Sequence, residues 1–242
     1  MKTFVSLLAL TLTLPAFADD AANPLSFNLG AVTDYRYRGI SQTRLKPALQ
    51  GGIDYAAPNG FYVGTWASTI KWIKDAGGDA GVEVDLYGGY KAEVAPGLTL
   101  DVGLLQYVYP GNKLNPSANT LEVYGALSFG PLTAKYSQST TNLFGFADSR
   151  NSGYFDVTAN LDLGELGMQG LTLSPHVGHQ TVRHNAAASY TDYALTLARD
   201  FSGLVVSGAL VGTDASKAAY ASPANGKFLG RTSLVLGLKK TF

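Results

Sequence analysis

The chain has 242 residues, and its 18 Lys and Arg residues balance its 18 Asp and Glu residues. This balance argues against a nucleic-acid-binding surface, and the absence of cysteine excludes a disulfide framework. Only 15% of the residues are charged, whereas Gly (28) and Tyr (14) are frequent. Such a composition is unusual for a soluble domain but natural for a β-barrel with a lipid-facing wall and aromatic belts.

The first 18 residues have the features of a secretory signal peptide. Lys2 supplies a positive charge, residues 4–14 are mostly apolar, and residues 16–18 form an A-x-A cleavage site. Pro15 interrupts the apolar stretch, which is too short for a spanning helix of about 20 residues. No later stretch is long enough either, so any membrane form must be a barrel. We expect a cleaved signal peptide (1–18) and one exported domain (19–242).

Alternation of apolar and polar residues predicts about twelve β-strands, which is an all-β pattern. Their connections alternate between long and short, as in outer-membrane barrels with long outer loops and short periplasmic turns. An even strand count places both termini in the periplasm. The sequence thus predicts a single antiparallel transmembrane β-barrel. The expected strands are 25–38, 47–57, 60–70, 81–91, 97–108, 119–129, 131–139, 152–163, 170–182, 190–200, 203–213 and 228–242.

Two of these strands fit the pattern less well. Residues 60–70 carry bulky side chains on both faces. Residues 170–182 contain Pro175, which has no N–H to donate to a neighbouring strand. Because a closed barrel has no edge strand, we expect a β-bulge at Pro175.

Alternation alone does not tell which face points outward, because a lipocalin-like barrel with an apolar interior has the same period. The polar face is rich in Gly, Ser, Thr and Tyr with charges of both signs, and aromatic residues gather near strand ends. The apolar face avoids Lys and Arg, which would cost roughly 2–4 kcal/mol at the lipid midplane. Lys240 is the exception, and we expect it to reach the periplasmic rim. These features favour a membrane barrel.

The last strand should close the barrel by pairing antiparallel with the first strand, because this removes the open edge. Its final aromatic residue resembles the C-terminal signature of bacterial outer-membrane barrels, through which the barrel-assembly machinery is the expected partner. Val235, Gly237 and Lys239 should face the lumen. The face expected to meet lipid carries Leu234, Leu236, Leu238 and Phe242.

Charged residues of the inward face are the candidates for lining a pore. Asp34, Arg36 and Arg38 form the densest cluster, on the first strand beside the closing seam. Rings of charge select ions, but opposite charges can also pair across a narrow lumen and help plug it. Both interpretations stay open for this cluster, and pairing is favoured for the isolated charges. The other candidates are Asp54, Glu83, Asp85, Asp101, Glu122, Lys135, Asp156 and Arg231.

A barrel of twelve strands has a backbone diameter of ~25 Å and leaves a gap of ~10 Å between side chains. Ions and small solutes pass such a gap if no loop folds inward. Residues 140–151, with Leu143, Phe144 and Phe146, are apolar enough to constrict the pore or to dock on a partner. A packed loop tip is the simpler interpretation.

The sequence offers little for catalysis. His176, His179 and His184 are the only histidines, and the first two face opposite sides of a strand, so they do not readily share a metal ion. His179 has the lipid-facing parity but no evident serine and acid partners. No P-loop, G-x-S-x-G or H-E-x-x-H motif occurs. We predict no enzyme activity, cofactor or metal site.

Residues 26–68 contain TDYRYRGISQT, PALQGGIDY and GFYVGTWAS in this order. This stretch closely resembles the TorF-type porin family of proteobacterial outer-membrane β-barrels, and residues 83–90 (EVDLYGGY) and Phe242 also fit. The resemblance implies an outer-membrane location and porin activity and supplies no active-site residues. We expect passive diffusion of ions or small solutes, with membrane lipid and these solutes as partners. A lipid-modifying enzyme of the outer membrane and a closed structural or adhesive barrel are the alternatives.

Overall fold

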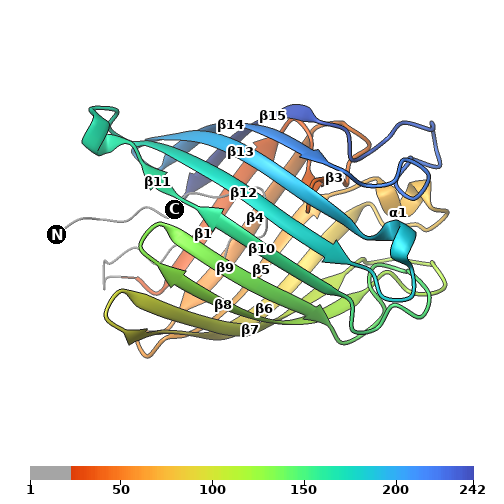
Figure 1. The fold of residues 1–242 in the computed structure, drawn as a ribbon, viewed down its shortest axis with the longest axis horizontal. Coiled ribbons are helices and arrows are strands. Elements are labelled where there is room, and N and C mark those ends of the chain that lie inside the picture. The colour runs from red at the N-terminus through yellow and green to blue at the C-terminus, as the bar shows by residue number, and fades with distance from the viewer. Residues whose placement is uncertain (1–22) are drawn as a thin grey trace.

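The computed structural model describes residues 23–242. The expected signal peptide lies outside the described residues. Twelve antiparallel strands form one closed barrel (Figure 1), in which each strand pairs with its neighbours along the chain. The strands are β1 (Leu25–Val32), β4 (Ala48–Ala56), β5 (Phe61–Thr69), β6 (Val82–Ala95), β7 (Leu98–Val108), β8 (Thr120–Phe129), β9 (Leu132–Ser139), β10 (Gly153–Ala159) continued by β11 (Leu161–Asp162), β12 (Leu171–Thr181), β13 (Tyr190–Phe201), β14 (Leu204–Thr213) and β15 (Ser233–Thr241).

The connections are long at one end of the barrel and short at the other. The short turns, residues 57–60, 96–97, 130–131, 163–170 and 202–203, lie at the end that also carries Leu25 and Phe242, here called the turn end (Figure 1). The opposite, loop end carries helix α1 (Trp72–Asp75), the 3-10 helix η2 (Ala186–Ala188) and the hairpin strands β2 (Arg36–Tyr37) and β3 (Ile40–Ser41), whereas the 3-10 helix η1 (Gly164–Leu166) lies in a turn. The predicted alternation of connections is confirmed. No helix among residues 23–242 is long and apolar enough to cross a membrane.

The predicted closing seam is confirmed. β1 pairs antiparallel with β15 from Asn28 opposite Thr241 to Val32 opposite Gly237. The backbone N–H of Phe242 donates to the carbonyl oxygen of Phe27 at 2.8 Å, and the reverse bond is 3.1 Å long. The pairing therefore extends to the last residue of the chain and leaves no unpaired edge at the seam.

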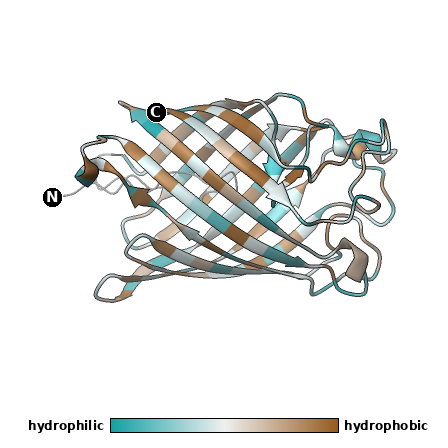
Figure 2. Ribbon diagram, turned by 45° about the horizontal axis from the view of Figure 1, so that its top comes forward, coloured by the Kyte–Doolittle hydropathy of each residue, from teal (hydrophilic) through white to brown (hydrophobic). Residues whose placement is uncertain are grey.

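The apolar face of the strands points outward. This is the orientation expected for a membrane barrel, whereas a lipocalin-like barrel has its apolar face inside. Leu29, Leu49 and Leu234 are 62%, 66% and 65% exposed on this face, and Leu236 and Leu238 also point outward. Figure 2 shows hydrophobic and more polar residues alternating along the strands of the wall. Exposed phenylalanines gather at the turn end, where they form part of an aromatic rim: Phe61, Phe129, Phe201 and Phe242.

The expected bulge at Pro175 is wrong. Pro175 pairs with Leu195 within an unbroken register between β12 and β13. On the other side, β10 and β11 keep one register against β12 and are separated only at Asn160. There the Ser174 hydroxyl donates to Asn160 Oδ1 at 2.8 Å. The missing N–H of proline thus interrupts the hydrogen-bond ladder, but no extra residue is inserted as in a bulge. A register shift occurs elsewhere in the wall, between β6 and β7 at Glu93 to Ala95.

Candidate functional site

The main departure from the expected wall is a hairpin inside the barrel. After β1 ends at Val32, β2 and β3 pair with each other and not with the wall. Their tip is Arg38–Gly39, with φ of 45° and 77°, as a type I′ turn requires. A Cβ on Gly39 would lie 2.4 Å from Thr213 and 2.8 Å from Asp192, so the tip packs tightly against β13 and β14. We call residues 34–41 the lumen hairpin.

The placement of Asp34, Arg36 and Arg38 in the wall of the first strand is therefore wrong. All three are buried, at 6%, 1% and 4% exposure, but they belong to the lumen hairpin. The alternation of residues 34–38 continues the pattern of β1, because a hairpin strand has the same period as a wall strand. The informative signal is the Arg-Gly pair, since glycine readily adopts a positive φ at a tight turn.

The tip of the lumen hairpin bridges two strands of the wall, β8 and β12, that are separated by β9 and β10. Arg38 Nη2 lies 2.8 Å from Glu122 Oε2 on β8, and Arg38 Nη1 donates to Gln180 Oε1 on β12 at 2.5 Å. Its guanidinium carbon is 4.1 Å from the ring centroid of Tyr154 on β10. Glu122 and Gln180 are 1% and 2% exposed. A single arginine thus links β8 to β12 across the interior through buried polar contacts.

The base of the lumen hairpin is fixed to the last long loop. Arg36 Nε is 2.5 Å from Asp34 Oδ2, and Arg36 Nη1 donates to the carbonyl oxygens of Leu229 and Arg231 at 2.9 and 3.1 Å. Asp34 Oδ1 also accepts a hydrogen bond from the hydroxyl of Ser41, at 2.5 Å. These charge-assisted bonds leave the hairpin little freedom in the described state.

The opposite face of the lumen hairpin is aromatic. The Tyr35 hydroxyl donates to Glu83 Oε1 on β6 at 2.5 Å, and the hydroxyls of Tyr37 and Tyr107 are 2.6 Å apart. Phe144, from the loop 140–152, packs edge-on against the rings of Tyr37 and Tyr107, with centroids 5.4 and 5.1 Å away. Of the alternatives for this loop, the structure supports inward folding over the lumen.

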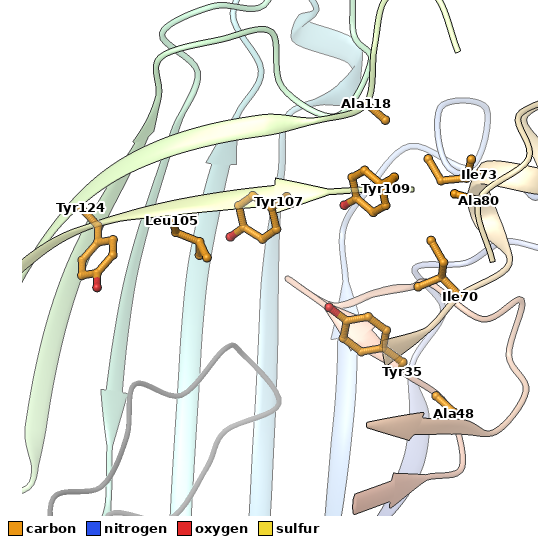
Figure 3. Close-up of a cluster of buried hydrophobic side chains, with 10 residues drawn as sticks. All are labelled: Tyr35, Ala48, Ile70, Ile73, Ala80, Leu105, Tyr107, Tyr109, Ala118 and Tyr124. Atoms are coloured by element: carbon orange, nitrogen blue, oxygen red, sulfur yellow. The ribbon is translucent and has the colours of Figure 1, made fainter. Parts of the chain in front are cut away.

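A buried core fills the loop end between the lumen hairpin, the wall and the covering loops (Figure 3). Ile73 of α1 is fully buried, and Tyr107 of β7 is 2% exposed. The gap of ~10 Å estimated for an empty barrel of this size is therefore occupied here. The core consists of Tyr35, Ala48, Ile70, Ile73, Ala80, Leu105, Tyr107, Tyr109, Ala118 and Tyr124.

Three predicted acidic residues lie within this filled half. Glu83 and Glu122 each contact the lumen hairpin, and both are at most 2% exposed. Asp85 is fully buried, and neither of its carboxylate oxygens has a hydrogen-bond partner among the described residues. Two of the three carboxylates therefore anchor the hairpin, while the third carries an uncompensated desolvation cost.

The remaining predicted residues of the wall lie inside the barrel around a set of tyrosines. Asp54 accepts a hydrogen bond from Tyr87, and Asp101 Oδ1 accepts one from Tyr62 at 2.6 Å. Lys135 Nζ lies 4.2 Å from the ring centroid of Tyr124, and half-buried Asp156 is opposite Lys135 in the β9–β10 register. We call this group the tyrosine ring: Asp54, Tyr62, Tyr87, Asp101, Tyr124, Lys135 and Asp156.

The tyrosines of this ring were not among the predicted residues, although they pack against glycines of the same inward face. A Cβ on Gly103 would lie 2.4 Å from the Tyr124 hydroxyl, and one on Gly89 would lie 2.5 Å from the Tyr62 hydroxyl. Each tyrosine thus lies across a glycine of the adjacent strand. This packing explains part of the high Gly and Tyr content of the chain. Inward-facing Gly and Tyr residues on neighbouring strands were the sequence feature from which the ring could have been predicted.

The histidines occupy separate environments. His176 points inward, with Nε2 3.0 Å from Asp192 Oδ2 and Nδ1 2.8 Å from Thr158 Oγ1. His179 is exposed, as its opposite parity predicted, and His184 lies in a loop beside Asp148. No group of three His, Cys, Asp or Glu residues among those described is arranged to hold a metal ion.

Arg231 is not part of the wall, because β15 begins only at Ser233. The residue lies in the loop 214–232, where its side chain is exposed and lines a cavity at the loop end. Its predicted position inside the pore is therefore wrong. Residues 228–232 alternate like a strand, so the last strand was predicted to begin earlier than β15 does.

A closed antiparallel barrel with an apolar outer wall and a polar interior is the architecture of transmembrane β-barrels. A KdgM porin in complex with disordered oligogalacturonate has a TM-score of 0.56 and 7% identity, with 90% of this chain and 99% of that chain covered. A NanC porin structure has a TM-score of 0.53 and 12% identity, with 90% and 98% covered. At such identities the similarity shows a shared fold.

The chain belongs to the family described as "Bacterial protein of unknown function (Gcw_chp)", whose model matches residues 18–242. A comparison with the curated proteins finds no match.

Proposed function

We propose that this protein is a channel of the outer membrane, closed in the described state by the lumen hairpin and open to ions or small solutes when the hairpin moves. The observation that carries this proposal is the bridge formed by Arg38 between Glu122 and Gln180. The contacts of Arg38 with Glu122 and Gln180 are hydrogen bonds, one of them within an ion pair, and water can replace them when the hairpin leaves. An inserted segment with two positions is a recognised type of switch.

The membrane location is supported by the exposed apolar wall and by the phenylalanines of the turn end. In this proposal residues 1–18 direct export and are removed, and the barrel-assembly machinery recognises the strand ending at Phe242. Both ends of the mature chain then lie in the periplasm, and the long loops face outward. The resemblance of residues 26–68 to TorF-type porins supports the same location. No catalytic role is proposed.

Conductance of the purified protein in planar bilayers tests the channel. β1 and β4 pair directly, with Val32 opposite Ala48, so residues 34–45 can be replaced by a short Gly-Ser turn without breaking the wall. We expect rare or small current steps for the wild type and large, persistent steps for the shortened variant. Heat-dependent gel mobility checks that both form barrels.

A permanently closed structural barrel is the competing function, because the loop end is packed like a protein core. The same recordings separate the two. If the shortened variant forms a barrel but passes no current, the wall or the other loops block the lumen without the hairpin, and the channel proposal fails.

A further inference from the structure

A cavity of about 340 Å³ opens at the loop end, beside the segment through which the lumen hairpin returns to the wall. Three distant parts of the chain line it: residues 43–46, the residue before α1 and the last long loop. Five of the 18 Lys and Arg residues of the chain meet here, although its overall charge is balanced. These residues, which we call the basic pocket, are Arg44, Lys46, Lys71, Lys227 and Arg231.

Most of this positive charge is not neutralised. Arg44 forms a salt bridge with Asp75, but within the described part of the chain Lys46, Lys71, Lys227 and Arg231 have no salt-bridge partner. The hydrogen bonds to Asp75 raise the pKa of Arg44 above its ordinary value, so this residue stays charged. Cations held close together repel one another and attract anions.

The walls of the basic pocket are held in place by buried polar contacts. Asp75 accepts hydrogen bonds from Arg44 Nε at 2.8 Å and from the hydroxyl of Ser222 at 3.2 Å, and its side chain is 2% exposed. Arg36 holds the backbone of the last loop through the carbonyl oxygen of Arg231. Three separate segments are thereby joined before any ligand arrives, which lowers the entropic cost of binding.

The backbone of the pocket wall is strained. Arg44 and Leu45 have φ values of 57° and 62°, and neither is a glycine. Residues in this sparsely populated region cost of order 1 kcal/mol or more each and persist where the surrounding structure holds them. Here the strain coincides with a charged cavity, and such coincidence is typical of ligand-binding segments.

We propose that the basic pocket binds a small solute that carries two or more negative charges as phosphate or carboxylate groups. The cavity volume is at the lower end of the range for small-molecule sites, about 300–1,000 Å³. Charged donors from several directions suit a compact anion better than a neutral sugar or a single carboxylate. Because the pocket contains the return segment of the lumen hairpin, a bound anion favours the inserted hairpin. This last step rests on the proposed channel function.

Isothermal titration calorimetry of the detergent-purified mature protein with inorganic pyrophosphate tests the site. We expect saturable binding that weakens about tenfold or more in a Lys227→Gln, Arg231→Gln double variant, because two charge-assisted contacts are lost. Lys217→Gln is the matched control, since this residue is exposed in the same loop but does not line the pocket. Absence of saturable binding, or equal binding by all three proteins, overturns the proposal.

A second titration distinguishes a free anion from a phosphorylated lipid headgroup, since both present the same chemistry. Pyrophosphate binding is measured again in micelles that contain phosphatidic acid. Unchanged affinity supports a free solute as the ligand. Competition by the lipid shows that the pocket takes a headgroup and overturns the assignment to a small solute.

Bilayer recordings separate this site from the channel proposal. Pyrophosphate added on the loop side should lower the open fraction of the wild type severalfold and leave the Lys227→Gln, Arg231→Gln variant unaffected. One outcome is that the wild type binds pyrophosphate saturably, but neither the wild type nor the variant in which residues 34–45 are replaced conducts. This outcome retains the site and refutes the channel. A conducting protein that binds no pyrophosphate retains the channel and refutes the site.

Discussion

The two halves of the barrel interior are built from the same strands but filled in different ways. At the loop end, the lumen hairpin and the covering loops bury Glu83 and Glu122 to 2% exposure or less. In the tyrosine ring, side chains of the wall strands fill the interior, because each tyrosine lies over a glycine of the adjacent strand. Lys135 and Asp156 are only half-buried there. The difference shows that side chains of the wall fill one half of the interior, whereas the other half is filled by connecting segments, above all residues 33–47.

The largest expected effect comes from the tip of the lumen hairpin. An Arg38→Met variant leaves Glu122 as a buried charge without its cationic partner, and breaking such a pair costs about 3–5 kcal/mol. We expect a lower free energy of unfolding in urea and more frequent current steps in bilayers. An Arg38→Met, Glu122→Gln double variant should regain most of the lost stability. Equal stability of the single variant and the wild type would show that Arg38 does not hold the hairpin.

A glycine of the tyrosine ring gives the next largest effect. In a Gly103→Ala variant the new methyl group meets the Tyr124 hydroxyl and the carbonyl oxygen of Gly88, at 2.4 and 2.7 Å before relaxation. Such overpacking costs about 1–3 kcal/mol, measurable as a lower transition temperature in heat-dependent gel mobility. Gly125→Ala is the matched control, because a Cβ there meets only Val102 at 4.0 Å. Similar losses in both variants would contradict the packing described.

Replacing Asp85, whose carboxylate has no hydrogen-bond partner among the described residues, should raise the free energy of unfolding. An Asp85→Leu variant replaces a buried polar group that has no hydrogen-bond partner with an apolar side chain of similar shape, and we expect a gain of about 1–2 kcal/mol in unfolding free energy. Asp101→Leu should instead lower stability, because it removes the acceptor of the hydrogen bond from the Tyr62 hydroxyl. Urea unfolding in detergent measures both. A stability loss at Asp85 would show that its carboxylate has a stabilising partner.

The smallest effect concerns the cation above Tyr124. A Lys135→Met variant keeps the apolar stem but removes the cation–π contact, which contributes about 0.5–1 kcal/mol when partly exposed. We expect a small stability loss and, in the variant that lacks residues 34–45, a shift toward cation selectivity. Reversal potentials under a salt gradient measure the second effect. Unchanged selectivity would place Lys135 outside the conduction path.

The wall was predictable because lipid on one side and a polar interior on the other impose a period of two on each strand. Even β12, which contains Pro175, follows this period along its whole length. The closing seam was predictable for a similar reason, since a barrel must pair its first and last strands.

The filling of the lumen was not predictable from alternation. A segment such as residues 34–38 reads the same whether it continues a wall strand or forms an inserted hairpin. Its position depends on partners far away in the sequence, including Gln180 and the carbonyl oxygen of Leu229. A single sequence does not show such long-range pairings, so the alternation identified charged residues that point inward but not how they are arranged.

The contacts of Arg36 and Thr33 with the end of the chain have a consequence for the order of assembly. Thr33 N–H donates to the carbonyl oxygen of Leu236 at 2.9 Å, and Arg36 contacts the carbonyl oxygen of Leu229. The two contacts join residues that are 203 and 193 positions apart in the sequence, and contacts of such wide separation form slowly. The lumen hairpin therefore waits for the final strand, and until then a nascent barrel has an open seam and a hydrated interior. Closing the ring and filling it become a single late folding event.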